Sequence, residues 1–225
     1  MENFKHWLPM RRLMSNFSTR AKLTTEFIGT LFLSLAVCTA AVLGTAGAYA
    51  PFAIASTLMV MIYAGGHISG AHYNPAVTVS IYLRGACEKS DLAPYIATQL
   101  AASTTGALIG VNILVPEGNV EALVLETGPA FAAELLFTFA LAYVILNVAT
   151  SETTEGNGFY GAAIALVVLA GALSVGSISG ASFNPAVTVA LIASDALSVE
   201  DSWIHFIPQL VGGCLAALAF KAQRV

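Results

Sequence analysis

Residues 68–79 read ISGAHYNPAVTV, and residues 178–189 read ISGASFNPAVTV. Ten of these twelve positions are identical, at an offset of 110 residues. A weaker match pairs residues 24–36, TTEFIGTLFLSLA, with residues 132–144, AAELLFTFALAYV, and it sets Glu26 against Glu134. Self-similarity over this distance indicates that the two halves of the chain are copies of one unit.

The composition places both copies in a membrane. Of the 225 residues, 57% are hydrophobic and 10% are charged, whereas soluble domains are about 45–50% apolar and about 25% charged. Apolar stretches long enough to cross a bilayer predict an all-α membrane protein with six spans, at about 22–43, 50–65, 92–115, 128–149, 159–175 and 203–220.

Each unit holds three spans and one Asn-Pro-Ala (NPA) segment, so the second copy is inverted relative to the first. Asn is a favoured helix N-cap and Pro a favoured first helical residue, which predicts short helices over 75–83 and 185–193. The Gly- and Ser-rich stretches before them, Gly65 to Ala71 and Gly176 to Ala181, are predicted as extended loops. Irregular backbone at this depth must line a cavity or be buried in protein, so both segments are expected to re-enter the membrane as half-helices.

Two half-helices meeting at the midplane would bring their positive ends together and oppose the passage of cations. The side-chain oxygens of Asn74 and Asn184 can cap these helices while their NH₂ groups face the lumen as neutral donors. Inverted repeats place their functional site at this junction.

The basic residues predict the orientation. All nine Lys and Arg lie before the first span, between the second and third, or after the sixth, and the positive-inside rule makes that face cytoplasmic. We therefore expect a multi-pass protein of the plasma (inner) membrane with both termini cytoplasmic. Its expected parts are a cytoplasmic tail (1–20), a first repeat (21–115), an external connecting loop (116–127), a second, inverted repeat (128–221) and a cytoplasmic C-terminus (222–225).

On these motifs the chain from about Ala21 to Phe220 resembles the major intrinsic protein (aquaporin and aquaglyceroporin) family. The resemblance implies a right-handed bundle of six helices and two half-helices, assembled as a homotetramer with one pore per subunit. It implies that Glu26 and Glu134 brace the NPA loops. It also implies pore residues of two kinds: the motifs Asn74, Pro75, Ala76, Asn184, Pro185 and Ala186, and a ladder of carbonyls from Gly70, Ala71, His72, Gly180, Ala181 and Ser182.

The chain departs from most of the family at the narrow filter. An Arg usually follows the second NPA, and here Val187 stands there. Counting from the motifs gives a filter of Ile54, Ala172, Ala181 and Val187, without charge or aromatic ring. Such a filter favours water together with glycerol, urea or undissociated metalloid hydroxides such as arsenous acid. Against glycerol, Thr188 occupies a position where the family's glycerol facilitators usually carry Asp. The short chain and compact loops favour a bacterial member.

Two alternatives remain open at this point: a water-selective aquaporin, and an ion-coupled secondary transporter with inverted repeats. Transporters usually carry a charged cluster at the midplane, where only the two glutamates are available. Neither catalytic residues nor a cofactor or nucleic-acid partner is expected. Cys38, Cys87 and Cys214 have no metal-ligand spacing; for His67 and His72, structural hydrogen bonding is favoured over a metal site or pH gate.

Overall fold

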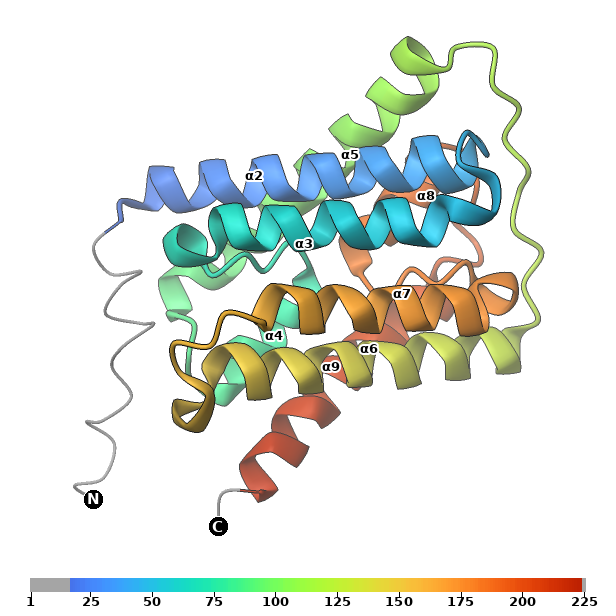
Figure 1. Ribbon diagram of the computed structural model, residues 1–225. Helices are drawn as coiled ribbons and strands as arrows, with labels where there is room; N and C mark the ends of the chain where they lie inside the picture. Colours follow the sequence, from blue (N-terminus) through green and yellow to red (C-terminus); the bar gives the residue numbers. More distant parts are fainter. Residues whose placement is uncertain (1–16, 224–225) are drawn as a thin grey trace.

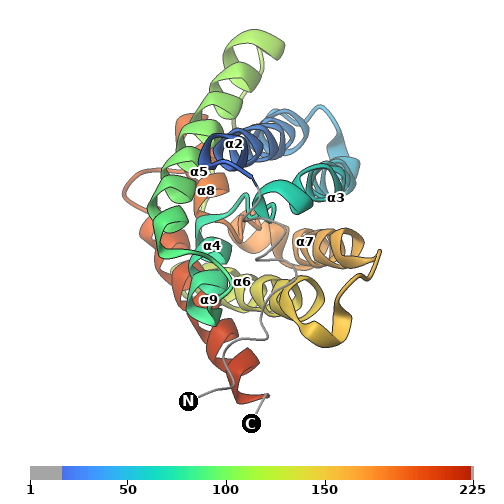
Figure 2. The same cartoon turned by 90° about the vertical axis from the view of Figure 1, so that its left-hand side faces the viewer.

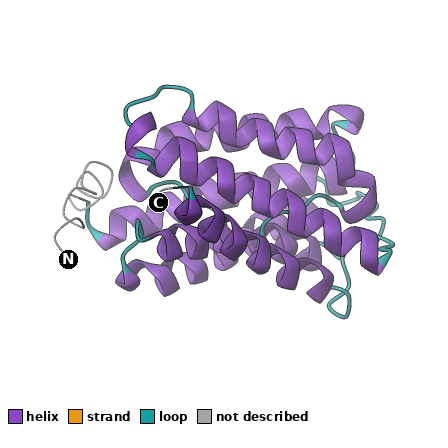
Figure 3. Ribbon diagram, turned by 90° about the horizontal axis from the view of Figure 1, so that it is seen from below, coloured by secondary structure: helices purple, strands orange, loops and turns teal. Residues whose placement is uncertain are grey.

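The computed structural model describes residues 17–223, and every regular element in that range is helical (Figure 3). Most of the 1–20 tail and the last two residues, for which we predicted cytoplasmic segments, lie outside the described range. Six helices are long and apolar enough to cross a membrane. They are α2 (Thr19–Ala36), α3 (Ala50–Ser69), α5 (Lys89–Ile109), α6 (Thr127–Thr150), α7 (Tyr160–Ser179) and α9 (Trp203–Ala222).

Two short helices, α4 (Pro75–Arg84) and α8 (Pro185–Ala193), begin at the prolines of the two NPA motifs. Both half-helices and all six spans predicted from the sequence are therefore present. Single π-helical segments, Val37–Val42 and Gly110–Leu114, continue α2 and α5, and short 3-10 turns occupy Gly47–Tyr49 and Glu152–Thr154.

The predicted extent of the irregular loops was wrong. Helix α3 continues through Gly65 to Ser69, and α7 continues through Gly176 to Ser179, so only residues 70–74 and 180–184 are non-helical. Both helices end at a left-handed glycine, Gly70 (φ 88°) or Gly180 (φ 79°), the usual C-terminal signal. Gly65 is required for close packing and not for a loop, since a Cβ on this helical residue would lie 2.1 Å from the Tyr73 hydroxyl.

The two repeats are interleaved rather than side by side (Figures 1 and 2). Helix α8 of the second repeat packs against α5 of the first, and α4 of the first packs against α9 of the second. Helices α3 and α7 also pack on each other across the repeat boundary. Each half-helix is therefore held in the middle of the bundle by a full-length helix of the opposite repeat.

Small residues let the long helices cross closely, as is usual for helices that associate in lipid. Gly106 on α5 faces α2, and Gly212 on α9 faces α6. Ala102 and Ala216 occupy the positions that match Gly212 and Gly106 in the other repeat. The two alanines are fully buried. A Cβ on Gly106 would lie 2.6 Å from the Leu31 carbonyl oxygen, and one on Gly212 would lie 2.6 Å from that of Leu135.

Gly212→Val is therefore expected to separate α6 from α9, because backbone atoms cannot yield as a flexible side chain can. Overpacking of this kind costs about 1–3 kcal/mol, and we expect the unfolding temperature in detergent to fall by several degrees. Gly128→Val is the matched control, since a Cβ at Gly128 meets nothing within 4 Å. Equal unfolding temperatures for the two variants would contradict the close crossing.

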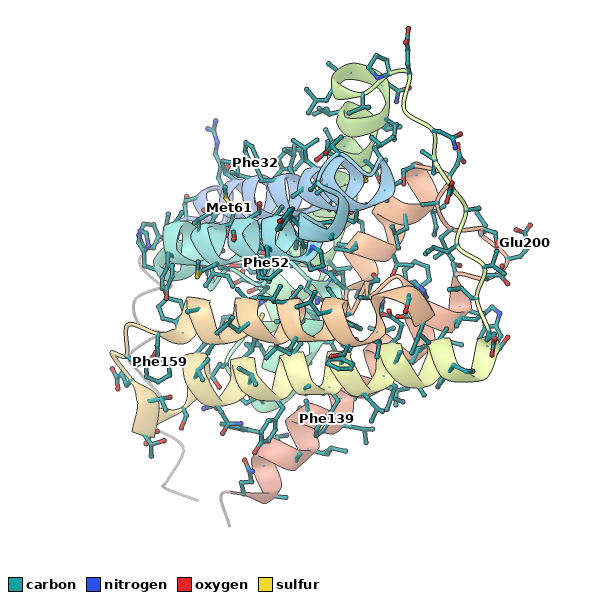
Figure 4. The ribbon with its side chains drawn as sticks, turned by 45° about the vertical axis from the view of Figure 1, so that its right-hand side comes forward. Phe32, Phe52, Met61, Phe139, Phe159 and Glu200 are labelled. Carbon is teal, nitrogen blue, oxygen red and sulfur yellow. The ribbon has the colours of Figure 1, made fainter. Side chains whose placement is uncertain are left out.

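The two ends of the bundle differ in charge. All described Lys and Arg residues lie at the basic end, which comprises loops 85–88 and 151–159 and both ends of the described chain. Loops 43–49, 115–126 and 194–202 form the acidic end, where Figure 4 shows Glu200. Between the ends, large apolar side chains such as Phe32 and Phe52 point outward (Figure 4) and are about half exposed, as a lipid-facing surface requires.

Candidate functional site

The two NPA motifs form the helix caps that their sequence predicts. The side-chain oxygen of Asn74 accepts hydrogen bonds from the backbone N–H groups of Ala76 (2.9 Å) and Val77 (3.3 Å). Asn184 accepts one from Ala186 at 2.9 Å. Each Asn has extended backbone and the Pro that follows is the first helical residue, so both half-helices begin at the motif.

The same two asparagines join the loops to each other. Asn74 Nδ2 donates to the carbonyl of Phe183 at 3.0 Å, and Asn184 Nδ2 donates to the carbonyl of Tyr73 at 2.9 Å. The positive ends of α4 and α8 are therefore held next to each other. Each NH₂ group carries two hydrogens, and the bond between the loops uses one of them. The expectation that these groups donate to the lumen therefore stays a prediction for the second hydrogen of each side chain.

A buried carboxylate holds the first loop from behind. Glu26 on α2 is fully buried. Its Oε1 accepts from Ser69 Oγ (2.6 Å) and from the His72 N–H (3.0 Å). Its Oε2 accepts from the Tyr73 N–H and from Gln99 Nε2, both at 2.8 Å. Four donors on three different segments thus share one side chain, which satisfies backbone groups that an irregular buried loop cannot pair internally.

Glu134 on α6 repeats this arrangement for the second loop. It accepts from Ser179 Oγ (2.7 Å), the Ser182 N–H (3.0 Å), the Phe183 N–H (2.7 Å) and Gln209 Nε2 (2.7 Å). The sequence reasoning missed the serines and glutamines of both sets. The repeat offset would have found them, because Ser69 and Ser179, like Gln99 and Gln209, are 110 residues apart.

These hydrogen bonds determine where the loop carbonyls point. The N–H groups of Ala71, His72 and Tyr73 all turn toward Ser69 and Glu26. In a trans peptide the preceding carbonyl points the opposite way, so the carbonyls of Gly70, Ala71 and His72 turn away from the carboxylate. The second loop does the same with the carbonyls of Gly180, Ala181 and Ser182, since the N–H groups that follow them bond to Ser179 and Glu134.

Both re-entrant loops have an uncommon backbone conformation, which accompanies the outward turn of their carbonyls. Ala71 and Tyr73 have φ of 50° and 49°, and Ala181 and Phe183 have φ of 50° and 49°. Non-glycine residues in this left-handed region cost on the order of 1–3 kcal/mol each and occur where surrounding structure enforces them. Here the glutamate hydrogen bonds and the buried rings of Tyr73 and Phe183 enforce them.

One cavity of about 1120 Å³ runs past both loops. Its lining includes Asn74, Asn184 and all six residues whose carbonyls turn away from the glutamates. It reaches residues of the acidic end, such as Gly44 and Asn119, and of the basic end, such as Glu152 and Asn157. The structure therefore brings the two motifs and both loops to one cavity in the middle of the bundle.

All four residues of the proposed filter, Ile54, Ala172, Ala181 and Val187, line this cavity. They come from α3, α7, the second re-entrant loop and α8 respectively. None of them carries a hydrogen-bonding side chain, so at these four positions a polar contact to a solute can come only from the backbone.

Thr188, which follows Val187, does not face the lumen as a free hydroxyl. It is fully buried, bonds to the Asn184 carbonyl (3.2 Å) and accepts from Gln209 Nε2 (3.0 Å). His72 is similarly engaged: its Nδ1 lies 3.2 Å from Thr78 Oγ1. Both side chains support the loops from behind, which agrees with the structural interpretation of His72.

The basic-end mouth of the cavity holds a buried cation. Arg84, at the end of α4, is 6% exposed and donates from Nε to Thr150 Oγ1 at 2.7 Å. Its guanidinium carbon also lies 4.9 Å from the centre of the Phe220 ring. Arg84 thus ties the first half-helix to the ends of α6 and α9.

Mercury sensitivity can test whether Ala181 faces the pore. Ala181 lines the cavity, whereas none of the three cysteines does: Cys38 is fully buried, and Cys87 in loop 85–88 and Cys214 on α9 are partly buried. Burial and the nearby Asp91 raise the pKa of the Cys87 thiol to about 12, so it stays protonated and weakly reactive at neutral pH. We expect wild-type water flux to withstand mercuric chloride, and Ala181→Cys to lose most of its flux until a thiol reductant is added. Full resistance of the Ala181→Cys protein to mercury would place residue 181 outside the conducting path.

Comparison with known proteins gives a consistent result. The family model described as "Major intrinsic protein" matches residues 13–220. Among similar proteins, aquaporin NIP1-2 of Arabidopsis thaliana is 34% identical over 221 residues, which cover 90% of this chain and 74% of the relative. Aquaporin NIP1-1 of Zea mays is 33% identical over 218 residues, with the same coverage of each chain. The expectation of a bacterial source stays a prediction, because these relatives are plant proteins.

The fold is also found in a solved structure. The aquaglyceroporin from Plasmodium falciparum superposes with a TM-score of 0.75 and covers 89% of this chain and 95% of its own. At 19% sequence identity this likeness concerns the fold alone.

Proposed function

This chain belongs to the major intrinsic protein family of membrane channels, and from that premise we propose that it conducts water and small uncharged solutes passively through the cavity between its re-entrant loops. The observation that carries the proposal is the composition of the filter. Ile54, Ala172, Ala181 and Val187 all line the cavity, and none of their side chains supplies a charge, a hydrogen bond or an aromatic ring.

The geometry of the loops supports selection for neutral solutes. The carbonyls turned away from Glu26 and Glu134 offer acceptors to a hydroxyl or amide that has lost its water. The asparagines keep the positive ends of both half-helices at the same point, which disfavours cations in a region of low dielectric constant. A neutral solute is not repelled by these helix ends, and it carries no charge that must lose its water.

The apolar filter favours solutes larger than water. Alanine at two of its four positions leaves space that bulky residues would fill, and Val187 brings no donor. We propose glycerol, urea and undissociated metalloid hydroxides such as arsenous acid as the solute class. The relatives support the wider class only: two are named aquaporins, and the structural neighbour is an aquaglyceroporin.

The alternatives differ from this proposal in identifiable ways. A water-selective pore would need a tight ring, and the four filter residues do not provide one. An ion-coupled transporter would need a coupling site at the midplane. The buried carboxylates Glu26 and Glu134 each already accept four hydrogen bonds from protein groups, so neither is placed to exchange an ion with the lumen.

Orientation and assembly belong to the same proposal. We place the basic end in the cytoplasm by the positive-inside rule, with the protein in the plasma (inner) membrane. A homotetramer with one pore per subunit agrees with a cavity that is complete within one chain.

Uptake of radiolabelled glycerol into proteoliposomes tests the mechanism. We expect a rate that rises linearly with glycerol concentration and does not change when a proton or sodium gradient is imposed. Protein-free vesicles and vesicles with the Gly128→Val variant provide the controls for leak and for nonspecific substitution. Saturable uptake that follows an ion gradient would show a transporter and overturn the channel proposal.

A further inference from the structure

The long loop between α5 and α6, residues 115–126, crosses the acidic end of the bundle instead of standing away from it (Figure 1). It has no helical structure and no turn after residue 117, yet a hydrogen bond fixes it to the bundle. The N–H of Leu123 donates to the carbonyl of Ala196 at 2.8 Å, in the turn that follows α8. The loop is thus attached to the second half-helix, which carries Val187.

Several side chains of this loop, including Val120, Leu123 and Leu125, pack inward against the core. Val124 is 96% exposed, whereas its neighbour Leu123 is partly buried and packs against the central apolar core. Alternation along an extended segment explains the contrast, since successive side chains point to opposite sides. Leu123 and Val124 both line the cavity, together with Ala181 and Val187, but of these two neighbours only Leu123 packs against the core.

The contact with Gly180 places Leu123 beside the filter. A Cβ built on Gly180 would lie 2.7 Å from Leu123 Cδ1, so the leucine covers the face of Gly180 where any other residue would carry its side chain. Gly180 directly precedes Ala181, a proposed filter residue, in the second re-entrant loop. A leucine from a distant loop therefore occupies space beside one of the two alanines in the ring.

We propose that Leu123 is a fifth specificity-determining residue of the filter, and that it limits the size of the solutes that pass. This inference rests on the proposed channel function and deepens it. Alanine at positions 172 and 181 leaves the ring open, and the isobutyl group of Leu123 supplies part of the missing wall. Being apolar, it narrows the entrance without adding a donor or a charge, so the chemistry of selection stays with the loop carbonyls.

The test compares two substitutions at the acidic end, Leu123→Ala and Val199→Ala, because Val199 is 68% exposed and is not among the residues that line the cavity. Water, glycerol and the larger polyol erythritol are measured by stopped-flow light scattering on proteoliposomes holding equal amounts of monodisperse protein. Leu123→Ala should raise the erythritol-to-water permeability ratio several-fold, and Val199→Ala should leave it at the wild-type value. Leu123→Phe should lower the glycerol-to-water ratio, because it adds apolar bulk at the same point.

The outcomes separate this inference from the proposed function. Wild-type vesicles that pass no solute would overturn the channel proposal itself. Solute flux in wild type with unchanged ratios in both Leu123 variants would leave the channel standing and overturn the role of Leu123. If Leu123→Ala gives no folded protein, the sign of the change in Leu123→Phe decides alone: a lowered ratio supports the inference and an unchanged or raised ratio contradicts it.

Discussion

Glu134→Ala is expected to abolish the folded channel. The substitution removes the acceptor of four buried donors: Ser179 Oγ, the N–H groups of Ser182 and Phe183, and Gln209 Nε2. Each donor left unpaired in a buried site costs about 1–3 kcal/mol, so the total is about 4–12 kcal/mol. That sum is comparable to the whole stability of a typical protein, about 5–15 kcal/mol.

The measurement is the fraction of monodisperse protein on size-exclusion chromatography after extraction in a mild detergent, together with its unfolding temperature. Glu121→Ala provides the control, because that glutamate is exposed in loop 115–126. Glu26→Ala should fail in the same way as Glu134→Ala, since Glu26 also accepts four hydrogen bonds. A Glu134→Ala channel that folds and conducts normally would show that the second loop is held by something else.

Val187→Arg is expected to convert a wide filter into a narrow, water-preferring one. The guanidinium group brings five donors and a fixed positive charge into a ring that has neither. Because pore diameter and lining donors set selectivity, we expect the glycerol-to-water permeability ratio to fall on the order of tenfold. Water conduction should persist, since the loop carbonyls and both asparagines are unchanged.

Val187→Leu separates the effect of charge from that of bulk. It enlarges the side chain but adds no donor, so only a modest decrease in the glycerol-to-water ratio is expected. Stopped-flow measurements on the two variants and wild type, at matched protein content, decide the point. If Val187→Leu reduces solute flux as strongly as Val187→Arg, the size of the ring alone controls entry and the donors do not matter.

The architecture was readable from the sequence because two independent signals agreed. Hydropathy predicted six spans, and the repeated SGAxxNPAVTV segment predicted two half-helices starting at Pro75 and Pro185. The caps of both half-helices depend on local chemistry, which is why Asn74 and Asn184 could be assigned in advance. The resemblance to the major intrinsic protein family rested on the same residues, and the match of the family model to residues 13–220 confirms it.

Features that depend on tertiary contacts could not be predicted in this way. The predicted ends of α3 and α7 came too early, because Gly65 and Gly176 suggested loops although both residues are helical. Leu123 shows the same limit: nothing in the connecting loop signals that this residue lies on Gly180 of the second repeat. The filter of Ile54, Ala172, Ala181 and Val187 stays a prediction, since lining a cavity does not by itself establish selection.

The most direct test of the central claim is the permeability of wild-type proteoliposomes to water, urea, glycerol and arsenous acid, measured by stopped-flow light scattering against protein-free vesicles. The wide apolar filter predicts that all four pass faster than through lipid alone. If only water does so, a group other than the four filter residues narrows the cavity, and the wide apolar filter is contradicted.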